Sequence, residues 1–294
     1  MSGINVLSLF DGMSCGRIAL DRAGIEVNNY FAAEIDDSAI KVSRSNFGDV
    51  THIGNVECIE YRNGTLYSEK GEFKVGNIDL ILAGSPCQSF SNLGDGTGFD
   101  GKSGLYLHFL RILKEVRPKN WLLENVVMKP VWRDVITTHL GTNPIKICSS
   151  LVSAQTRRRY YWTNMSVTEF PVEKDITLRE ILCTNACKTL TLSGKGLNKL
   201  SRKRNRATNI DVKTKVPCLL ASQSRKPTDA IVFYGKGVPP RYPTRSEMEK
   251  LQTVPLGYTN AVGYNDAARM LGNGWTVDII AHILKSIELE DEDE

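Results

Sequence analysis

The feature that most constrains the fold is a regular alternation between short apolar runs and segments with helical spacing. Each apolar run is only a few residues long and is followed by a helical pattern, as in the run Ile4–Leu9 and the helical segment that ends at Gly24. Continuous short apolar runs of this kind are typical of parallel strands that are buried on both faces. The alternation therefore predicts an α/β fold with a doubly wound, mostly parallel sheet. Besides Ile4–Leu9, the predicted strands are Asn29–Ala33, Ile78–Ala83, Trp121–Glu124, Ile145–Val152 and Tyr160–Thr163, and further helices are predicted at Asp37–Asn46, Leu105–Val116 and Val131–Leu140.

The pattern changes between about Thr177 and Pro240. Ser, Thr, Lys, Arg and Asn dominate there and apolar runs are short, before helical spacing returns at Ser246–Leu251 and Val277–Leu289. We therefore expect a discontinuous main domain, residues 1–176 and 241–294, that is interrupted by a small loop-rich domain, residues 177–240.

The charge is distributed very unevenly. Between Lys195 and Arg245 there are 13 basic residues against the two acids Asp211 and Asp229, a local net charge of +11 in a chain whose total is +4. Such a segment is either a surface that binds a polyanion, with nucleic acid the first candidate, or a solvated basic loop. The acidic stretch Glu288–Glu294 is expected to be a frayed, solubilising end.

Length and cysteine content narrow the class of protein. The 294 residues lack an apolar run long enough to cross a membrane, and the start MSGINVLSLF resembles a buried strand more than a signal peptide. The seven cysteines are odd in number and scattered, unlike a secreted disulfide framework. We expect a soluble intracellular protein, located in the cytoplasm.

The turn after the first predicted strand is a candidate ligand site. Phe10–Gly16 contains two glycines that let the backbone approach a ligand, at the sheet edge where parallel folds bind ligands. Glu34 ends the second strand and could accept hydrogen bonds from ribose hydroxyls. The turn lacks the GxGxxG pattern, so a nucleoside ligand is favoured over a dinucleotide; the alternative is an ordinary tight turn beside a surface acid.

Two further strand ends carry reactive groups. Cys87 lies in the Gly84–Ser89 loop directly after a buried strand, where a thiol can become an exposed nucleophile, although most cysteines are buried and inert. Glu124 ends the strand Trp121–Glu124, where it could equally cap a helix. Further along, Gln155, Arg157 and Arg159 alternate, so they share one face of a predicted strand, either to bind an anion or to protect a sheet edge.

In chain order these motifs resemble the motif series of the DNA cytosine-5 methyltransferases. The resemblance extends from about residue 4 to residue 287 and implies a Rossmann-like, S-adenosylmethionine-dependent fold with a target recognition domain at 177–240. Gly274–Val277, with its tryptophan, is closer to the de novo type of these enzymes. The segments that carry the resemblance are Phe10–Gly16, Glu34, Ser85–Gln88, Glu124–Val126, Gln155–Arg159, Arg241–Glu247 and Gly272–Asn273.

The resemblance implies a covalent mechanism on a cytosine flipped out of double-stranded DNA. It assigns to Cys87 the attack on C6, and to Glu124 a proton that is donated to or shared with N3. Arg159 would bind the base carbonyl O2, and Arg157 would hold the Cys87 loop or a phosphate. The glycine-rich segment Ser89–Gly104 would close over the base.

The resemblance also implies the remaining site residues. Asn55 stands where the family usually has an aspartate that contacts the adenine amino group, and its side-chain carbonyl could still accept that hydrogen bond. No metal is expected. The residues implied for S-adenosylmethionine are Phe10, Asp11, Gly12, Met13, Ser14, Glu34, Ile35, Asn55, Pro86, Leu105, Asn273 and Trp275, and those for DNA are Gln88, Ser89, Gln155, Arg202, Lys203, Arg204, Arg206 and Arg241.

Three alternatives remain open. A transfer-RNA cytosine-5 methyltransferase shares the catalytic motifs, although the Cys-Phe-Thr tripeptide of those enzymes is missing here. A catalytically silent nucleic-acid-binding protein could retain the fold, and Cys183, Cys187 and Cys218 are loosely suggestive of zinc. We expect a monomer that binds double-stranded DNA and no membrane, from a bacterium or phage, either with a separately acting restriction endonuclease or as an orphan modifier.

Overall fold

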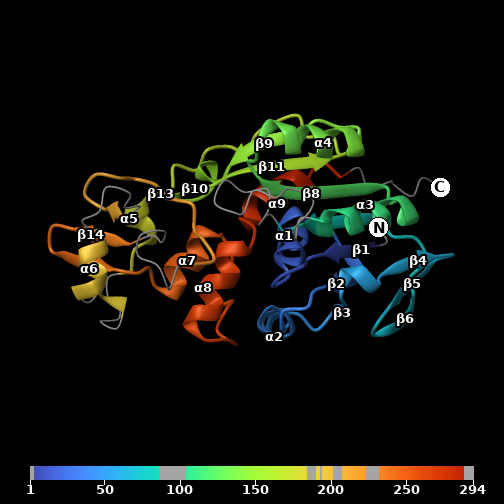
Figure 1. The fold of residues 1–294 in the computed structure, drawn as a ribbon, viewed down its shortest axis with the longest axis horizontal. Coiled ribbons are helices and arrows are strands. Elements are labelled where there is room, and N and C mark those ends of the chain that lie inside the picture. The colour runs from blue at the N-terminus through green and yellow to red at the C-terminus, as the bar shows by residue number, and fades with distance from the viewer. Residues whose placement is uncertain are drawn as a thin grey trace. The chain divides into compact units, whose positions relative to one another are not determined.

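The chain forms two compact units. The computed structural model describes residues 3–86, 104–183, 190–192, 194–200, 207–222 and 232–287. Unit 1 comprises the described parts of Met1–Ile147, Arg158–Phe170 and Ile280–Glu294, and unit 2 those of Cys148–Arg157 and Pro171–Ile279 (Figure 1). The segment expected to form the small domain, 177–240, falls within unit 2, which also takes in flanking residues on both sides.

Unit 1 is built on a seven-stranded sheet with strand order β3-β2-β1-β7-β8-β11-β9. Strands β1, β2, β3, β7 and β8 are parallel to one another, and β11 is antiparallel to β8. This confirms the predicted doubly wound, mostly parallel sheet. The strands are β1 (Ile4–Leu9), β2 (Val27–Ala33), β3 (Val50–Gly54), β7 (Leu80–Gly84), β8 (Asn120–Val126), β9 (Ile145–Cys148) and β11 (Arg158–Thr163).

The helices of unit 1 begin and end where local chemistry dictates. Helix α1 ends at Gly24, which adopts φ 76° and donates its N–H to carbonyls of the last turn. Helix α2 begins at Asp36, whose side chain accepts from the amides of Ser38 and Ala39. The helices are α1 (Cys15–Ala23), the 3₁₀ turn η1 (Val56–Cys58), α2 (Asp37–Asn46), α3 (Leu105–Val116) and α4 (Pro130–Leu140).

One core cluster joins the sheet to α3 and α4. Tyr106 and Phe109 of α3 and Ile136 of α4 are fully buried against strand residues such as Leu9 and Ile81. Because side chains alternate along a strand, the neighbouring Val6 and Ser8 face the other side of the sheet. Burial of its hydrophobic face therefore holds α3, the next described helix after β7, against the sheet.

A three-stranded antiparallel sheet, β4 (Glu60–Arg62), β5 (Thr65–Ser68) and β6 (Gly71–Lys74), follows η1. The two-residue loop between β4 and β5 is Asn63-Gly64, with φ 50° and 75°, which is the geometry expected of an Asn-Gly hairpin turn. Leu66 of β5 packs into the core cluster of unit 1. The sequence analysis missed these hairpins although the Asn-Gly signal was present.

Unit 2 is a mixture of short strands and helices. Leu192, Ala207 and Val232 form a separate small cluster beside the sheet β12-β14-β15, and Tyr234 and Tyr242 pack against it. Thr244 and Glu247 form a capping box at the start of α7. The elements are η4 (Ser149–Leu151), β10 (Gln155–Thr156), α5 (Leu178–Ile181), α6 (Gly194–Leu200), β12 (Thr208–Asn209), β13 (Val216–Pro217), β14 (Phe233–Gly235), β15 (Val238–Arg241), α7 (Arg245–Leu251), α8 (Tyr264–Asn273) and the first residues of α9 (Val277–Leu284).

Most predicted elements of unit 1 are confirmed within a few residues, and Asp37–Asn46 and Leu105–Val116 match α2 and α3 at both ends. The strand predicted at Ile145–Val152 is wrong after Cys148, because the chain turns into η4 there. Strand β3 and helix α8 were missed. Across the described ranges, no helix combines the length and the apolar character that a membrane crossing requires.

Candidate active site

The carboxyl ends of four neighbouring strands form the candidate site in unit 1. The registers pair Leu9 with Ala33 and with Ala83, and Gly84 with Glu124. The Phe10 turn, Glu34 and the Ser85-Pro86 segment therefore follow strands β1, β2 and β7 at one edge of the sheet, as the sequence predicted. Glu124 lies near the carboxyl end of β8 at the same edge. Cys87 itself, with Gln88, Ser89 and most of the predicted closing segment, lies outside the described residues.

The turn after β1 is held in an unusual backbone conformation. Phe10, Gly12 and Ser14 have φ angles of 57°, 62° and 61°, a left-handed region that costs free energy for the two non-glycine residues. Phe10 packs partly against the core, and the amide of Asp11 donates to the carbonyl of Ala33 at 3.0 Å. The turn is therefore preorganised, with Gly12 at its accessible centre.

The side chains of this turn point inward. Asp11 accepts from the Tyr30 hydroxyl at 2.7 Å and from the Ser14 hydroxyl at 2.5 Å, and Ser14 in turn contacts the Ser43 hydroxyl at 2.6 Å. Burial raises the pKa of Asp11 to about 6, against the lowering effect of its hydrogen bonds to Ser14 and Tyr30. Asp11, Met13 and Ser14 are all buried, and Gly12 is the more exposed residue of the turn.

Glu34 is fixed by three backbone amides. Its Oε2 accepts from Gly12 N at 2.7 Å, and its Oε1 accepts from the amides of Ile35 and Asp36 at 2.8 Å each. A carboxylate has about four acceptor positions, so one remains at Oε2 for a hydroxyl donor. This acceptor position beside the Gly12 turn fits the ribose role predicted for Glu34.

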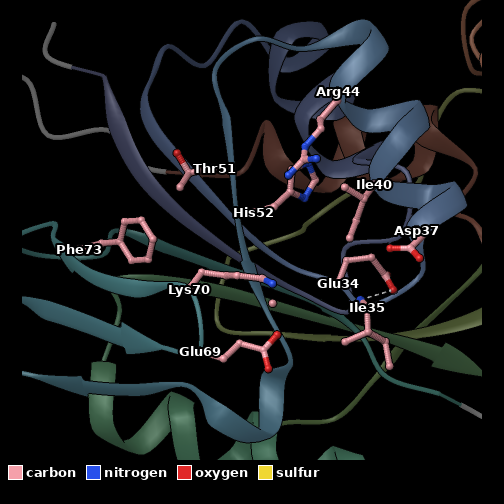
Figure 2. A pocket seen from close by; sticks show the side chains of 11 residues that line it. Glu34, Ile35, Asp37, Ile40, Arg44, Thr51, His52, Glu69, Lys70 and Phe73 are labelled. Carbon is pink, nitrogen blue, oxygen red and sulfur yellow. Dashed lines mark hydrogen bonds between the residues drawn. The ribbon is translucent and has the colours of Figure 1, made fainter.

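A cavity of about 520 Å³ opens beside Glu34. This volume is within the range of small-molecule sites. Figure 2 shows side chains around it that come from the end of β2, from α2, from β3 and from the β5–β6 turn. Ile35 is 70% exposed and offers an apolar surface to a flat ring. The cavity is lined by Glu34, Ile35, Asp37, Ile40, Arg44, Thr51, His52, Gly54, Glu69, Lys70 and Phe73.

Together these features fit the adenosine part of S-adenosylmethionine. They provide an acceptor for a ribose hydroxyl, an exposed apolar side chain and enough volume. Sequence reasoning missed Glu69 and Lys70 because it assigned no hairpin to residues 60–74, and it missed His52 because it assigned no strand to residues 50–54. Arg44 was placed on a predicted helix but was given no role in the site. Pro86 and Leu105, also predicted for the cofactor, are half-buried, and Leu105 packs against the core.

Asn55 has a structural role that the sequence did not predict. Its Oδ1 accepts from the amide of Glu57 at 3.1 Å and so caps the 3₁₀ turn η1. The carbonyl oxygen that the sequence assigned to the adenine amino group is therefore already engaged with the protein, with one acceptor position left.

Glu124 and Arg159 form an ion pair at the end of β8. Arg159 Nε lies 2.9 Å from Glu124 Oε1, and the two side chains are 13% and 11% exposed. The antiparallel pairing of β11 with β8 sets this contact, because it places Arg159 opposite Val126 and Tyr161 opposite Glu124. Both side chains are almost buried, so the carboxyl and the guanidinium can each form a hydrogen bond to a ring with little competition from solvent.

Asn125 connects this pair to the end of β7. Its Nδ2 donates to Ser85 Oγ at 3.0 Å, and its Oδ1 accepts from the amide of Val126 at 2.8 Å. Asn125 and Ser85 are both buried. The segment that leads into Cys87 is thus tied to the strand that carries Glu124.

Arg157, in unit 2, is used as an internal tie. It is 3% exposed, and its terminal nitrogens donate to the carbonyls of Leu219 at 3.0 Å, Gly272 at 3.2 Å and Gly274 at 2.8 Å. These donors are buried and directed at backbone carbonyls, and the predicted contact of Arg157 with the Cys87 loop or a phosphate stays a prediction. Gly272 is packed so closely that an added Cβ would lie 2.2 Å from the backbone of Leu220.

Two residues predicted to bind DNA are also buried within unit 2. Gln155 is fully buried, with its amide group bonded to Leu251 O, Gln252 Oε1 and Leu219 N. Arg241 is 6% exposed and forms two hydrogen bonds of 2.8 Å to Glu247. Each side chain satisfies buried polar groups of the protein, which argues for a structural role, and the two DNA-binding predictions stay untested.

The remaining predicted residues are less constrained. Asn273 is exposed and Trp275 half-buried, both in unit 2. Arg202, Lys203, Arg204 and Arg206 lie outside the described residues, as does Cys187 of the zinc alternative. The part of the chain that is described holds no cluster of three or more His, Cys, Asp or Glu residues suited to a metal ion.

The mostly parallel sheet, with its polar groups gathered at the carboxyl edge, has the Rossmann-like α/β architecture. The family model "C-5 cytosine-specific DNA methylase" matches residues 4–129, which include every strand end of the candidate site. This part of the chain, less than half of its 294 residues, is thus similar to the C-5 cytosine methyltransferases.

Individual relatives are similar to the chain over different lengths. The chain is 36% identical over 122 residues to the type II methyltransferase M1.ScrFI of Lactococcus lactis subsp. cremoris, which covers 41% of this chain but only 28% of that relative. It is 25% identical over 311 residues to the type II methyltransferase M.NlaX of Neisseria lactamica, with 96% of both chains covered. Among solved structures, the Entamoeba histolytica methyltransferase EhMeth superposes with a TM-score of 0.74 at 17% identity, covering 97% of this chain and 98% of that one, and shows the same fold.

Proposed function

We propose that the protein is a DNA (cytosine-5-)-methyltransferase that modifies cytosines within a short specific sequence of double-stranded DNA. The observation that carries the proposal is the pairing of Gly84 with Glu124 on adjacent strands, which sets the segment leading to Cys87 beside the Glu124–Arg159 pair. The bond from Asn125 to Ser85 supports the same arrangement.

In the proposed reaction the residues of the chain activate a flipped-out cytosine. The Cys87 thiolate adds to C6, forming an S–C6 bond, and the electron pair of the C5–C6 double bond makes C5 nucleophilic. Glu124 donates or shares a proton at N3, and Arg159 donates a hydrogen bond to O2, so that the negative charge on the ring is stabilised. S-adenosylmethionine supplies an electrophilic methyl group. Loss of the C5 proton to solvent then restores the double bond and expels the Cys87 thiolate.

Cofactor binding is assigned to the edge of unit 1. Glu34 would accept a ribose hydroxyl at the remaining position on Oε2, with Ile35 against the base and the backbone of the Gly12 turn toward the methionine part. Three backbone amides already hold Glu34 in place, so little ordering is needed when the ligand binds.

DNA recognition is assigned to residues 177–240 as a target recognition domain. Its basic character favours phosphate contacts, which give affinity without sequence information. The cytosine must leave the base stack to reach a thiol, at a cost of a few kcal/mol. We propose a monomeric enzyme of the bacterial cytoplasm, acting either beside a separate restriction endonuclease or as an orphan modifier.

The test combines activity with a covalent trap. Purified protein with methyl-labelled S-adenosylmethionine should label duplex DNA, and a duplex that carries 5-fluorocytosine at the target should form a stable adduct, since fluorine cannot leave C5 as a proton does. Bisulfite sequencing of DNA from expressing cells then identifies the sequence. The matched control, Cys87→Ser, should bind DNA without forming an adduct.

Two outcomes would replace the proposal. Labelling of transfer RNA but not of duplex DNA would identify an RNA methyltransferase with the same catalytic groups. DNA binding with neither labelling nor adduct, by the wild-type protein with cofactor present, would indicate a catalytically silent binding protein.

A further inference from the structure

The β5–β6 turn brings a carboxylate to the adenosine cavity that the family motifs do not include. Ser68 pairs with Gly71 across the hairpin, so Glu69 and Lys70 form its two-residue tip. Figure 2 shows both side chains reaching the cavity from this tip, while Glu34 and Ile35 reach it from the end of β2. The hairpin is anchored to unit 1 by the buried Leu66 and by the amide of Tyr61, which donates to Glu115 at 3.2 Å.

Glu69 is directed toward Gly54 and Asn55. Its Oε1 accepts from the amide of Asn55 at 3.2 Å. Gly54 permits this approach because a Cβ at that position would lie 2.2 Å from the same oxygen, and its φ of 87° favours glycine as well. Glu69 is exposed and, among the described residues, has no ion-pair partner, so Oε2 keeps its acceptor capacity on the cavity side.

The residue at position 55 fits this arrangement. An aspartate at 55 would set a second carboxylate beside Glu69, and like charges at such short range repel. Asn55 is neutral, and its Oδ1 is engaged with the amide of Glu57. The acceptor that an aromatic amino group needs is thus supplied at this end of the cavity by residue 69, while the side chain of residue 55 caps η1.

We propose that Glu69 is a specificity-determining residue that recognises the 6-amino group of the adenine in S-adenosylmethionine. The inference rests on the proposed function, because it assumes that the cavity takes this cofactor. A carboxylate accepts hydrogen bonds from a 6-amino purine and repels the 6-oxo group of a hypoxanthine ring. The cavity should therefore discriminate between adenosyl and inosyl ligands.

The experiment measures binding without catalysis. Calorimetry gives dissociation constants of S-adenosylhomocysteine and S-inosylhomocysteine for the wild type, for Glu69→Gln and for Glu69→Ala. The matched control is Glu72→Gln, which removes a carboxylate from the same hairpin. We expect Glu69→Ala to weaken S-adenosylhomocysteine binding about tenfold and S-inosylhomocysteine binding less than twofold. Glu69→Gln should narrow the preference, since an amide can also donate to a 6-oxo group.

The outcomes separate this inference from the proposed function. Equal weakening of both ligands by Glu69→Ala, no effect on either, or the same effect from Glu72→Gln would overturn the role of Glu69 while leaving the cofactor site in place. A wild-type protein that binds neither ligand would overturn the proposed function and this inference with it.

Discussion

The strand ends of unit 1 and the polar residues of unit 2 were predicted from the same kind of sequence pattern, but they behave in opposite ways. In unit 1, Glu34 and Glu124 lie at the edge of the sheet, one beside a cavity and one paired with Arg159. In unit 2, Gln155 and Arg241 are buried and satisfy the groups around them. A polar residue that follows a buried parallel strand has its position set by the sheet, whereas a polar residue in a loop-rich region takes whichever partners the fold leaves unpaired.

The difference has a physical cause. A buried N–H or C=O without a partner costs free energy, and unit 2 has many irregular segments whose backbone groups lack strand neighbours. Long polar side chains fill this need, as Arg157 does for three carbonyls and Lys215 does for Ser150, Ser153 and Ile176. The amount of basic charge in a loop-rich region therefore overestimates the charge that is free to bind DNA.

The largest expected effect is the loss of methyl-transfer activity when Glu124, the acid near the end of β8 in unit 1, is replaced. Glu124→Gln keeps the shape and the hydrogen-bonding capacity of the side chain but cannot share a carboxyl proton with N3. We expect the single-turnover rate of methyl transfer to fall about 10³-fold, while the dissociation constant for DNA changes little.

The matched control is Glu115→Gln, which removes a carboxylate from another Arg–Glu pair, Arg111–Glu115, on α3. Its rate should remain within twofold of wild type. A fall of less than tenfold for Glu124→Gln would mean that the acid at this strand end has a structural role, as the acids of unit 2 have.

Arg241 gives the corresponding test for unit 2. Glu247 is fully buried and accepts from Arg241 and from the amides of Cys183 and Thr244. Arg241→Met leaves this carboxylate without its cation, which should lower the free energy of unfolding by about 3–4 kcal/mol in urea titrations. The affinity of the folded fraction for DNA should not change.

Arg179→Met serves as the control, because Arg179 is 69% exposed and lies 3.6 Å from Asp211. It should alter the free energy of unfolding by less than about 0.5 kcal/mol. If Arg241→Met instead weakened DNA binding and left the free energy of unfolding unchanged, Arg241 would be a DNA-binding residue, as the resemblance implies.

Sequence reasoning succeeded where local rules determine position. Apolar runs and helical spacing predicted α2, α3 and the order of the strands, so the position of Glu34 and Glu124 at one edge of the sheet could be predicted from the sequence, while their roles stay predictions. Sequence reasoning did not anticipate the contacts that three predicted site residues make within the protein. The carbonyl partners of Arg157 lie 62 to 117 residues further along the chain, whereas Asn55 and Arg241 bond to the nearby Glu57 and Glu247. The β4–β5 hairpin could have been predicted from its Asn63-Gly64 turn, whereas Glu69 lies at the tip of the next hairpin, β5–β6, whose two tip residues are Glu69 and Lys70.

Asp11 tests the contrast from within unit 1, because it is a motif residue that is buried like those of unit 2. Burial raises its pKa from 3.8 to about 6. The folded state then holds a proton that the unfolded state releases, so its contribution to stability is complete below about pH 4 and is lost as the pH rises through about 6.

We therefore expect the unfolding free energy of the wild type to fall, relative to that of Asp11→Asn, by at most about 3 kcal/mol between pH 4 and pH 7. Urea titrations followed by tryptophan fluorescence at a series of pH values measure this difference. A difference that is independent of pH would show that the carboxyl titrates alike in both states.

The smallest effect concerns Gln155, which contacts Leu219, Leu251 and Gln252 within unit 2. Gln155→Leu keeps the volume but removes the acceptor of the Leu219 amide, while Leu251 O keeps its bond from Ser153 and Gln252 Oε1 its bond from Thr276. We expect a loss of about 2 kcal/mol in the free energy of unfolding. Because the side chain is fully buried, the slope of DNA affinity against salt concentration should equal that of the wild type.

Lys203→Ala is the matched comparison, since Lys203 belongs to the basic stretch 202–206 that was assigned to DNA. Loss of one phosphate contact should reduce the salt slope by about 1 without a change in stability. If Gln155→Leu reduced the salt slope and Lys203→Ala did not, polar residues buried in the free protein would have to become exposed on binding DNA, and burial would no longer separate structural from DNA-binding residues in unit 2.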